Sequence, residues 1–323
     1  MNKSVVPIVT VSSAEYLDYA LVMMWSVLEH GNSGTIYHFY LFHNELTEGM
    51  QNWFKEQLLV WENCIVSFLD IRTIESKFLP APGEWTGKLA CFSLFCVDFL
   101  PQYDKVLALD IDLIVQRDIA QLYNTKMGNA LLGAVYDLDF IGQWCKGNRE
   151  YHRYYKEEVP LPDPKHYIQT GVLVINLQEL RKNFLPGLFI TVAAKKKFRY
   201  DDQDIWNLYV GNRVMKLDYR WNVLHNNNQY RLRYVMDFAP LEEFQAYMES
   251  RKDPFIVHYA GDQKPWDDMN CDFGDVFWDT VKHTPVSEKI TARVSPKSKT
   301  LHSRCLRKLY YEWRRLCEKL RHV

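Results

Sequence analysis

The sequence has no run of about 18 uncharged apolar residues, the shortest stretch that reads as a helix crossing a membrane. Its first residues, Met1 to Pro7, become polar too soon for a secretory signal peptide. We therefore expect no membrane-spanning segment and a cytoplasmic location.

Paired cysteines and a charge excess are missing as well. The seven cysteines include no C-x-x-C pair, which argues against a disulfide framework or a zinc knuckle and favours reduced thiols. The 39 Lys and Arg residues nearly balance the 40 Asp and Glu residues, and a formal net charge of −1 argues against a nucleic-acid-binding protein. A hydrophobic fraction of 47% excludes disorder as the main state.

Strand-like and helix-like patterns alternate along the chain. Crossover connections between such strands favour a parallel sheet, so we predict an α/β fold with a mostly parallel central sheet flanked by helices. The expected strands are 5–11, 36–42, 64–69, 105–109, 171–176 and 255–259, and the expected helices are 16–30, 50–61, 88–99 and 203–210.

Residues 137–168 interrupt this alternation. The segment is polar and aromatic, and Pro160, Pro162 and Pro164 stop regular structure near its end. A lid or acceptor-binding segment and a plain surface insertion both fit this composition.

Two carboxylates follow the apolar strand 105–109. Asp110 and Asp112 stand at the carboxyl end of this strand, the edge of an open α/β sheet where ligands bind. Two oxygen donors in this position can hold a hard divalent cation, which can bridge phosphate oxygens. A metal site is favoured over a chance acidic pair because unpaired charge beside a buried strand is costly.

A second strand, 255–259, ends in a polar loop. His258 can complete a metal shell, Gly261 lets the backbone approach a ligand closely, and Lys264 offers a charge for phosphate. Each residue has an ordinary structural explanation, but together they favour a pyrophosphate-binding loop.

Two further runs are less specific. Asp202 stands where the N-cap of the helix 203–210 is expected, which alone explains the polar run Asp202 to Asp204. Gly171 to Asn176 is a strand with a glycine at its entry.

In this order, the runs resemble glycosyltransferase family 8, the retaining GT-A enzymes that include bacterial lipopolysaccharide galactosyl- and glucosyltransferases and glycogenin. The resemblance covers roughly residues 5–266. The family's metal motif is similar to Lys105 to Asp112, its G-V-x-x-x-N strand to Gly171 to Asn176, its D-Q-D helix start to Asp202 to Asp204, and its H-Y-x-G-x-x-K-P-W loop to His258 to Trp266. The last match has no gap.

The resemblance implies a set of site residues. Asp110, Asp112 and His258 would ligate Mn²⁺, with Mg²⁺ as the alternative. Asp202 would bind hydroxyls of the donor sugar, and Gln203 would lie near the anomeric carbon. The UDP part of the donor would lie against the remaining positions, which are Thr10, Val11, Ser13, Lys88, Ile111, Gly261 and Lys264.

Three positions depart from the family pattern. Ser13 (or Ser12, one register earlier) stands where the family usually offers an Asp to the base, Ser93 replaces an Arg that helps to hold the donor, and Gln169 replaces an Asn. Lys88 stands where it would compensate for the missing Arg.

The function implied is transfer of glucose or galactose from a UDP-sugar to a glycan, as in the synthesis of lipopolysaccharide or another cell-surface polysaccharide. A nucleotidyltransferase would need a Gly- and cation-rich loop after the first strand, and Ser12 to Glu15 has neither. A non-catalytic sugar-nucleotide or glycan-binding protein on a degenerate scaffold is the alternative, because of Ser13 and Ser93.

We divide the chain into a catalytic domain, 1–270, and a C-terminal extension, 271–323. Residues 297–323 hold nine Lys or Arg against two Glu, a formal charge of +7 that leaves −8 for the rest. Residues 301–320 have the pattern of an amphipathic helix with Leu, Tyr and Trp opposite the cations, which favours an anionic membrane surface over docking on the acidic body. The protein would then be peripheral on the inner face of the membrane.

We predict that deletion of residues 297–323 releases the protein from anionic liposomes and changes donor hydrolysis little, because the tail supplies the cations but none of the site residues. Co-sedimentation with vesicles measures the first effect and release of UDP the second. Unchanged sedimentation would mean that the tail is structural.

Overall fold

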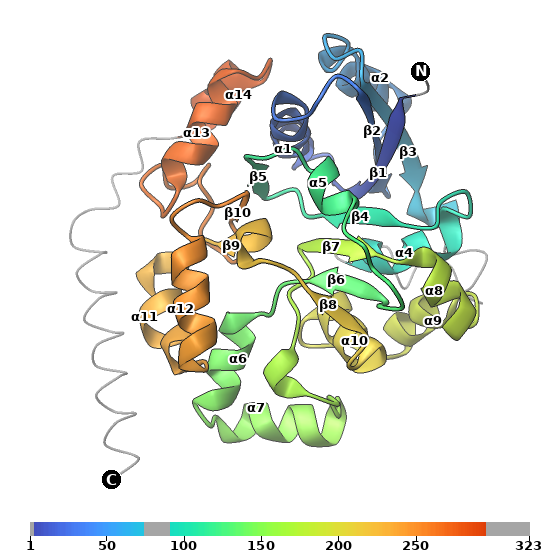
Figure 1. Cartoon of the computed structure of the whole chain (residues 1–323). Coiled ribbons are helices and arrows are strands. Elements are labelled where there is room, and N and C mark those ends of the chain that lie inside the picture. Colours follow the sequence, from blue (N-terminus) through green and yellow to red (C-terminus); the bar gives the residue numbers. More distant parts are fainter. Residues whose placement is uncertain (1–2, 74–90, 295–323) are drawn as a thin grey trace.

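The computed structural model describes residues 3–73 and 91–294. The larger of its two sheets has seven strands in the order β3-β2-β1-β4-β7-β6-β8 (Figure 1). Strands β3, β2, β1 and β4 run parallel, as do β6 and β8, whereas β7 is antiparallel to both β4 and β6. The mostly parallel sheet is thus confirmed. The strands are β1 Ser4–Val11, β2 Thr35–His43, β3 Cys64–Asp70, β4 Val106–Leu109, β6 Leu132–Ala134, β7 Val172–Ile175 and β8 Val214–Lys216.

A second, three-stranded sheet was not expected from the sequence. Its order is β5-β10-β9, with β10 antiparallel to β5 and parallel to β9. Its strands are β5 Leu113–Val115, β9 Val223–Leu224 and β10 Ile256–His258. The sequence predicted β10, as the strand 255–259, whereas β5 and β9 are too short for their periodicity to be recognised.

Helices connect and cover the strands (Figure 1). They are α1 Leu17–Glu29, α2 Glu48–Gln57, α4 Phe92–Phe99, α5 Ala120–Tyr123, α6 Leu138–Cys145, α7 Arg149–Arg153, α8 Leu177–Asn183, α9 Leu188–Lys195, α10 Asp201–Val210, α11 Arg231–Tyr234, α12 Leu241–Ser250, α13 Gly274–Lys282 and α14 Ser287–Arg293. Within the described ranges, no helix is both long and apolar enough to cross a membrane.

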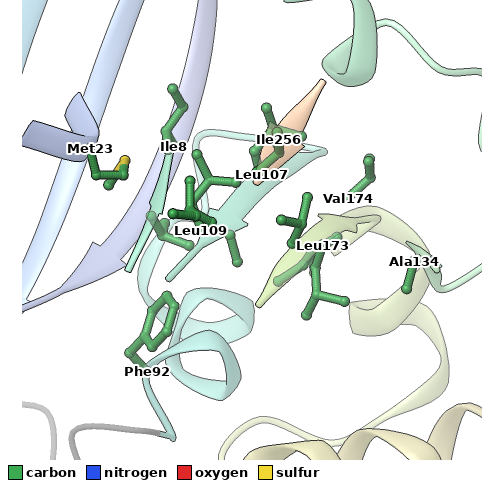
Figure 2. Close-up of a cluster of buried hydrophobic side chains, with 14 of the residues drawn as sticks. Ile8, Met23, Phe92, Leu107, Leu109, Ala134, Leu173, Val174 and Ile256 are labelled. Atoms are coloured by element: carbon green, nitrogen blue, oxygen red, sulfur yellow. The ribbon is translucent and has the colours of Figure 1, made fainter. Parts of the chain in front are cut away.

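The core lies around β4, whose four residues Val106–Leu109 are all buried. β4 pairs with β1 on one edge and with β7 on the other, so it is a central strand, and the burial of all four side chains shows that both of its faces are covered. Figure 2 shows Leu107 and Leu109 of β4 with Ile8 of β1 and Leu173 of β7, and with Met23 and Phe92 from helices α1 and α4. This packing fixes the strand end that carries Asp110.

The C-terminal helices pack against the first helix. Lys289 and Arg293 of α14 contact the carboxylate of Asp18 on α1 at 2.8 and 2.7 Å, and the Asp18 side chain is 3% exposed. Beside it, Tyr19 stacks on Trp266 with ring centroids 3.9 Å apart. The loop that ends at Trp266 is therefore held from the N-terminal side of the fold.

Residues 137–168 are more regular than their prolines suggest. Helices α6 and α7 and a π-helix, Tyr154–Glu158, precede Pro160, and the 3-10 helix Pro164–His166 follows. Phe140 stacks on Tyr167 with centroids 3.5 Å apart, and both rings are buried. The segment thus has a buried aromatic core of its own.

The carboxylate of Asp204, on helix α10, holds the segment 137–168 in place through hydrogen bonds. It accepts hydrogen bonds from the hydroxyls of Tyr167 at 2.6 Å, Tyr155 at 3.0 Å and Tyr154 at 3.5 Å, and from the amide of Tyr200 at 3.1 Å. Burial raises the pKa of Asp204, and these hydrogen bonds oppose the rise.

We predict that Tyr167→Phe destabilises the protein by about 1 to 3 kcal/mol, because it leaves a buried carboxylate oxygen short of a donor. Tyr209→Phe is the matched control: its ring packs on Phe184 and Phe189, and its hydroxyl has no hydrogen-bond partner among the described residues. Urea denaturation measures both. Equal stability of the two variants would contradict this role of Asp204.

Candidate active site

Three potential metal ligands meet where the two sheets join. Asp110 directly follows β4 of the large sheet, Asp112 directly precedes β5 of the small sheet, and His258 is the last residue of β10. The pairing of His258 with Leu113 in β5 brings the histidine beside Asp112. The chain therefore passes from one sheet to the other between the two aspartates.

The three side chains have the geometry of a cation site. Nε2 of His258 lies 3.2 Å from Oδ1 of Asp112 and 3.5 Å from Oδ2 of Asp110. One candidate ligand atom from each residue lies within 4.8 Å of the others. Two carboxylates and an imidazole suit a divalent cation such as Mn²⁺. The sequence-predicted set is thus brought together.

Burial and neighbouring charges separate the two aspartates. Burial raises the pKa of Asp110 to about 6, against the opposing influence of His258 and with a contribution from Asp112. Burial acts the same way on Asp112, but there the charges of His258 and Lys264 outweigh it and lower the pKa. Such a site gathers negative charge that a bound cation can neutralise.

Gly171 supports two of these ligands from the entry of β7. Its carbonyl accepts the amide of Asp110 at 2.9 Å. A Cβ at this position would lie 2.2 Å from Cε1 of His258 and 2.7 Å from Oδ2 of Asp110. The glycine that the sequence marked only as a strand entry is therefore required by close approach.

The loop after β10 places Lys264 at the site. Its ammonium group donates to Oδ2 of Asp112 and to the carbonyl of Tyr259, the latter at 2.8 Å. Gly261 has a φ of +112°, and a Cβ there would lie 2.6 Å from Nδ2 of Asn227. Both residues therefore lie on the loop predicted to hold phosphate, and the glycine is needed for its backbone shape.

Asp202 does not cap its helix, contrary to the sequence-based prediction. Helix α10 begins at Asp201, two residues before the expected start, and the side chain of its N-cap residue, Tyr200, makes no capping hydrogen bond. Asp202 is buried, and Oδ2 accepts the hydroxyl of Ser93 at 2.5 Å. Burial raises its pKa well above the usual value, while Ser93 opposes the rise. The carboxylate of Asp202 therefore binds a buried residue of α4 instead of capping helix α10.

Gln203 lies between the metal ligands and the segment 137–168. Its Nε2 donates to Oδ2 of Asp137 at 2.9 Å, and its Oε1 accepts the amide of Thr170 at 3.2 Å. Thr170 precedes Gly171, so Gln203 is one residue removed from the glycine that contacts Asp110. Burial raises the pKa of Asp137 to about 6, with a contribution from Asp139.

The other predicted donor-binding residues lie at the end of β1 or beside the aspartates. Thr10 is buried in β1, and its hydroxyl has no hydrogen-bond partner in the described part of the chain. Val11 ends β1, Ser13 follows it half-buried, and Ile111 lies between the two aspartates. Lys88 lies outside the described residues.

Sequence reasoning missed several residues that contact this site. Asn222 hydrogen-bonds His258, and Asp137 hydrogen-bonds Gln203. Neither carries a local signal, because their partners are 36 and 66 residues away in the chain. Ser93 and Gln169 were noted only as departures from a family pattern.

The fold is that of the GT-A glycosyltransferases. Two solved structures share the fold. The WbbM bifunctional glycosyltransferase has a TM-score of 0.78 and is 23% identical, covering 91% of this chain and 52% of its own. The galactosyltransferase LgtC in complex with donor and acceptor sugar analogs has a TM-score of 0.68 and is 22% identical, covering 89% of this chain and 100% of its own.

The chain belongs to glycosyltransferase family 8. The model of this family, described as "Glycosyl transferase family 8", matches residues 7–270. The family resemblance of the motifs is thereby confirmed. "Glycosyltransferase GlyA" of Streptococcus pneumoniae is 26% identical over 84% of this chain and 34% of its own length. "Lipopolysaccharide glucosyltransferase WaaO" of Escherichia coli is 24% identical over 77% and 68%. The chain thus spans about a third of the length of GlyA.

Gly171→Ala should abolish binding of Mn²⁺, because the added methyl group would displace His258 and Asp110 together. Titration calorimetry of the protein with Mn²⁺ measures the effect. Gly49→Ala in α2 is the control, since a Cβ there meets only Oγ1 of Thr47 at 3.9 Å. Wild-type affinity in Gly171→Ala would refute the close approach at this glycine.

Proposed function

We propose that the protein is a metal-dependent, retaining hexosyltransferase that moves glucose or galactose from a UDP-sugar to a glycan acceptor. The observation that carries this proposal is the cluster of Asp110, Asp112 and His258, with Lys264 beside it, at the carboxyl end of β4. Relatives named lipopolysaccharide glucosyltransferases support a role in the synthesis of lipopolysaccharide or another cell-surface polysaccharide.

The donor diphosphate would bind at the junction of the sheets. Asp110, Asp112 and His258 would hold Mn²⁺, or alternatively Mg²⁺, which neutralises the charge that develops as a nucleoside diphosphate departs. Lys264 would add a fixed positive charge on the same side, and the backbone at Gly261 would approach the phosphates. Because Lys264 donates to the carboxylate of Asp112, we expect it to exchange this carboxylate for a phosphate oxygen when the donor binds.

The nucleoside would lie against the end of β1. Thr10 supplies a buried hydroxyl without a partner among the described residues, which is free to bind a polar group of the donor. Val11, Ser13 and Ile111 would complete this contact, and Ser13 would offer a hydroxyl where relatives use an Asp. Lys88 remains a proposed contact.

The sugar would lie between Asp202 and Gln203. The amide of Gln203 is held at both ends by Asp137 and Thr170, so it can hold a sugar or acceptor hydroxyl in place but is a poor nucleophile. Asp204 is occupied by tyrosine hydroxyls. These contacts support front-face substitution: the bond from C1 to the phosphate oxygen breaks, the bond from C1 to the acceptor oxygen forms, and the acceptor proton passes to the departing phosphate.

The acceptor would lie beside residues 137–168, which Gln203 and Asp204 link to helix α10. A glycan or a lipid-linked saccharide would reach the site from this side. We assign catalysis to residues 1–270 and propose that the extension 271–323 holds the protein on an anionic inner membrane surface through its basic tail.

A donor screen tests this proposal. UDP-glucose, UDP-galactose, UDP-N-acetylhexosamines and a GDP-sugar are each incubated with Mn²⁺ and, separately, with a chelator, and release of UDP or GDP is measured. We expect chelator-sensitive release of UDP from one hexose donor. Asp110→Asn and Asp112→Asn should each abolish it and leave the fold intact, whereas Asp279→Asn, an exposed residue paired with Lys282, should retain full activity.

Two outcomes would contradict the proposal. Full activity of either active-site variant would refute the metal assignment. Absence of UDP release from every donor, together with absence of Mn²⁺-dependent UDP binding by calorimetry, would favour a non-catalytic glycan-binding protein on a degenerate scaffold. A glycosyl group trapped on Asp202 or on another carboxylate would refute the front-face mechanism alone.

A further inference from the structure

We propose that a buried relay of hydrogen bonds from the backbone of Gly171 through Gln169 and Asn222 sets the tautomer of His258 and makes Nε2 its metal-binding atom. Gln169 and Asn222 are thus positioning residues. The inference rests on the metal site proposed above, but the tautomer itself can be measured without metal or donor.

The first hydrogen bond of the relay has a backbone N–H as its donor, and this group cannot act as an acceptor. The amide N–H of Gly171 can only donate, and it lies 2.7 Å from the Gln169 side chain. The Gln169 atom facing it must therefore be the acceptor, Oε1. The backbone of Gly171 therefore fixes the orientation of the Gln169 side-chain amide.

In the second step, the orientation of the Gln169 amide fixes the orientation of the Asn222 amide. Oε1 of Gln169 also lies 2.5 Å from the Asn222 amide, and an oxygen requires a donor there, so this atom is Nδ2. The other end of the same amide is then Oδ1, which lies 2.9 Å from Nδ1 of His258. Because Oδ1 can only accept, Nδ1 must carry a hydrogen.

The third step reaches the metal ligands. A neutral imidazole carries one hydrogen, so a hydrogen on Nδ1 leaves the lone pair on Nε2. Nε2 is the atom 3.2 Å from Asp112 and 3.5 Å from Asp110, which is the side where a cation would be held. The opposite tautomer would point an N–H at the cation and a lone pair at Oδ1 of Asn222.

Burial gives the relay its strength. The exposed fractions are 1% for His258, 1% for Asn222 and 8% for Gln169, so water cannot replace a misdirected donor or acceptor. Both amides are neutral and keep the same polarity at every physiological pH, unlike the carboxylate that often supports a metal-binding histidine. Gly171 also accepts the amide of Asp110, so one residue orients two ligands.

The first test combines metal binding with the tautomer. Asn222→Leu removes both hydrogen bonds and should weaken Mn²⁺ binding by about 10- to 100-fold, measured without nucleotide from the paramagnetic resonance of free Mn²⁺. Nitrogen chemical shifts of the metal-free protein, at a pH where the ring is neutral, should show the hydrogen on Nδ1 of His258. The spectrum of His258→Gln identifies the signal, and Asn222→Leu should move the hydrogen to Nε2 in a fraction of the molecules.

Matched variants separate orientation from loss of stability. Asn176→Leu removes a buried amide at the far end of β7, where Nδ2 bonds the carbonyl of Ala130, and should lower stability without changing Mn²⁺ affinity. Gln169→Leu breaks the relay and should act like Asn222→Leu. Gln169→Glu keeps an oxygen that accepts from both Gly171 and Asn222 and should preserve the tautomer and the affinity.

A hydrogen on Nε2 with none on Nδ1 of His258 in the wild type, or equal Mn²⁺ affinity in the wild type, Asn222→Leu and Gln169→Leu, would overturn the relay. If Asn222→Leu does not fold, Gln169→Leu decides. A protein that shows the predicted tautomer and weakened binding in these variants, but releases UDP from no donor, would retain the relay and lose the proposed function.

Discussion

The fold depends on how three residues, Asp110 to Asp112, pass between two sheets. The amide of Asp110 bonds the carbonyl of Gly171 at the edge of the large sheet, and the carbonyl of Asp112 accepts the amide of Tyr259 beside the small sheet. The backbone is thus fixed at both ends, and the two carboxylates lie close together beside His258. Two neighbouring carboxylates repel each other, which explains why the ammonium group of Lys264 lies beside Asp112.

The proposed donor side and the proposed acceptor side of the site share one helix. The first turn of α10 carries Asp202, which bonds Ser93 on α4, Gln203, which bonds Asp137, and Asp204, which holds three tyrosines of the segment 137–168. Arg231 links the same segment to the loop after β10, since it contacts Asp139 at 2.8 Å and the carbonyl of Ala260 at 2.9 Å. Because these contacts are buried and closely packed, a displacement of residues on one side would also displace residues on the other.

The sequence predicted the residues whose signal is local. Asp110 and Asp112 follow an apolar strand, and His258 ends another, so strand periodicity alone places them at a sheet edge. The partners of these residues could not be predicted, because Asn222 reaches His258 only after β9 pairs with β10. The interpretation of Asp202 as a cap was wrong for a related reason. Local spacing placed the helix start two residues too late, and Ser93, 109 residues away in the chain, decides where the carboxylate points.

Ser93 also changes the chemistry of the donor-sugar side. Where the family resemblance leads one to expect an Arg, this chain presents a neutral hydroxyl that donates to Asp202 and accepts Nε1 of Trp206 at 2.8 Å. A guanidinium would hold Asp202 ionised, whereas burial beside Ser93 raises its pKa well above the usual value. Ser93 opposes this rise only as a neutral hydrogen-bond donor. The substitution therefore replaces the charged partner expected for Asp202 by a neutral hydrogen bond, while Asp110, Asp112 and His258 keep the arrangement of a cation site.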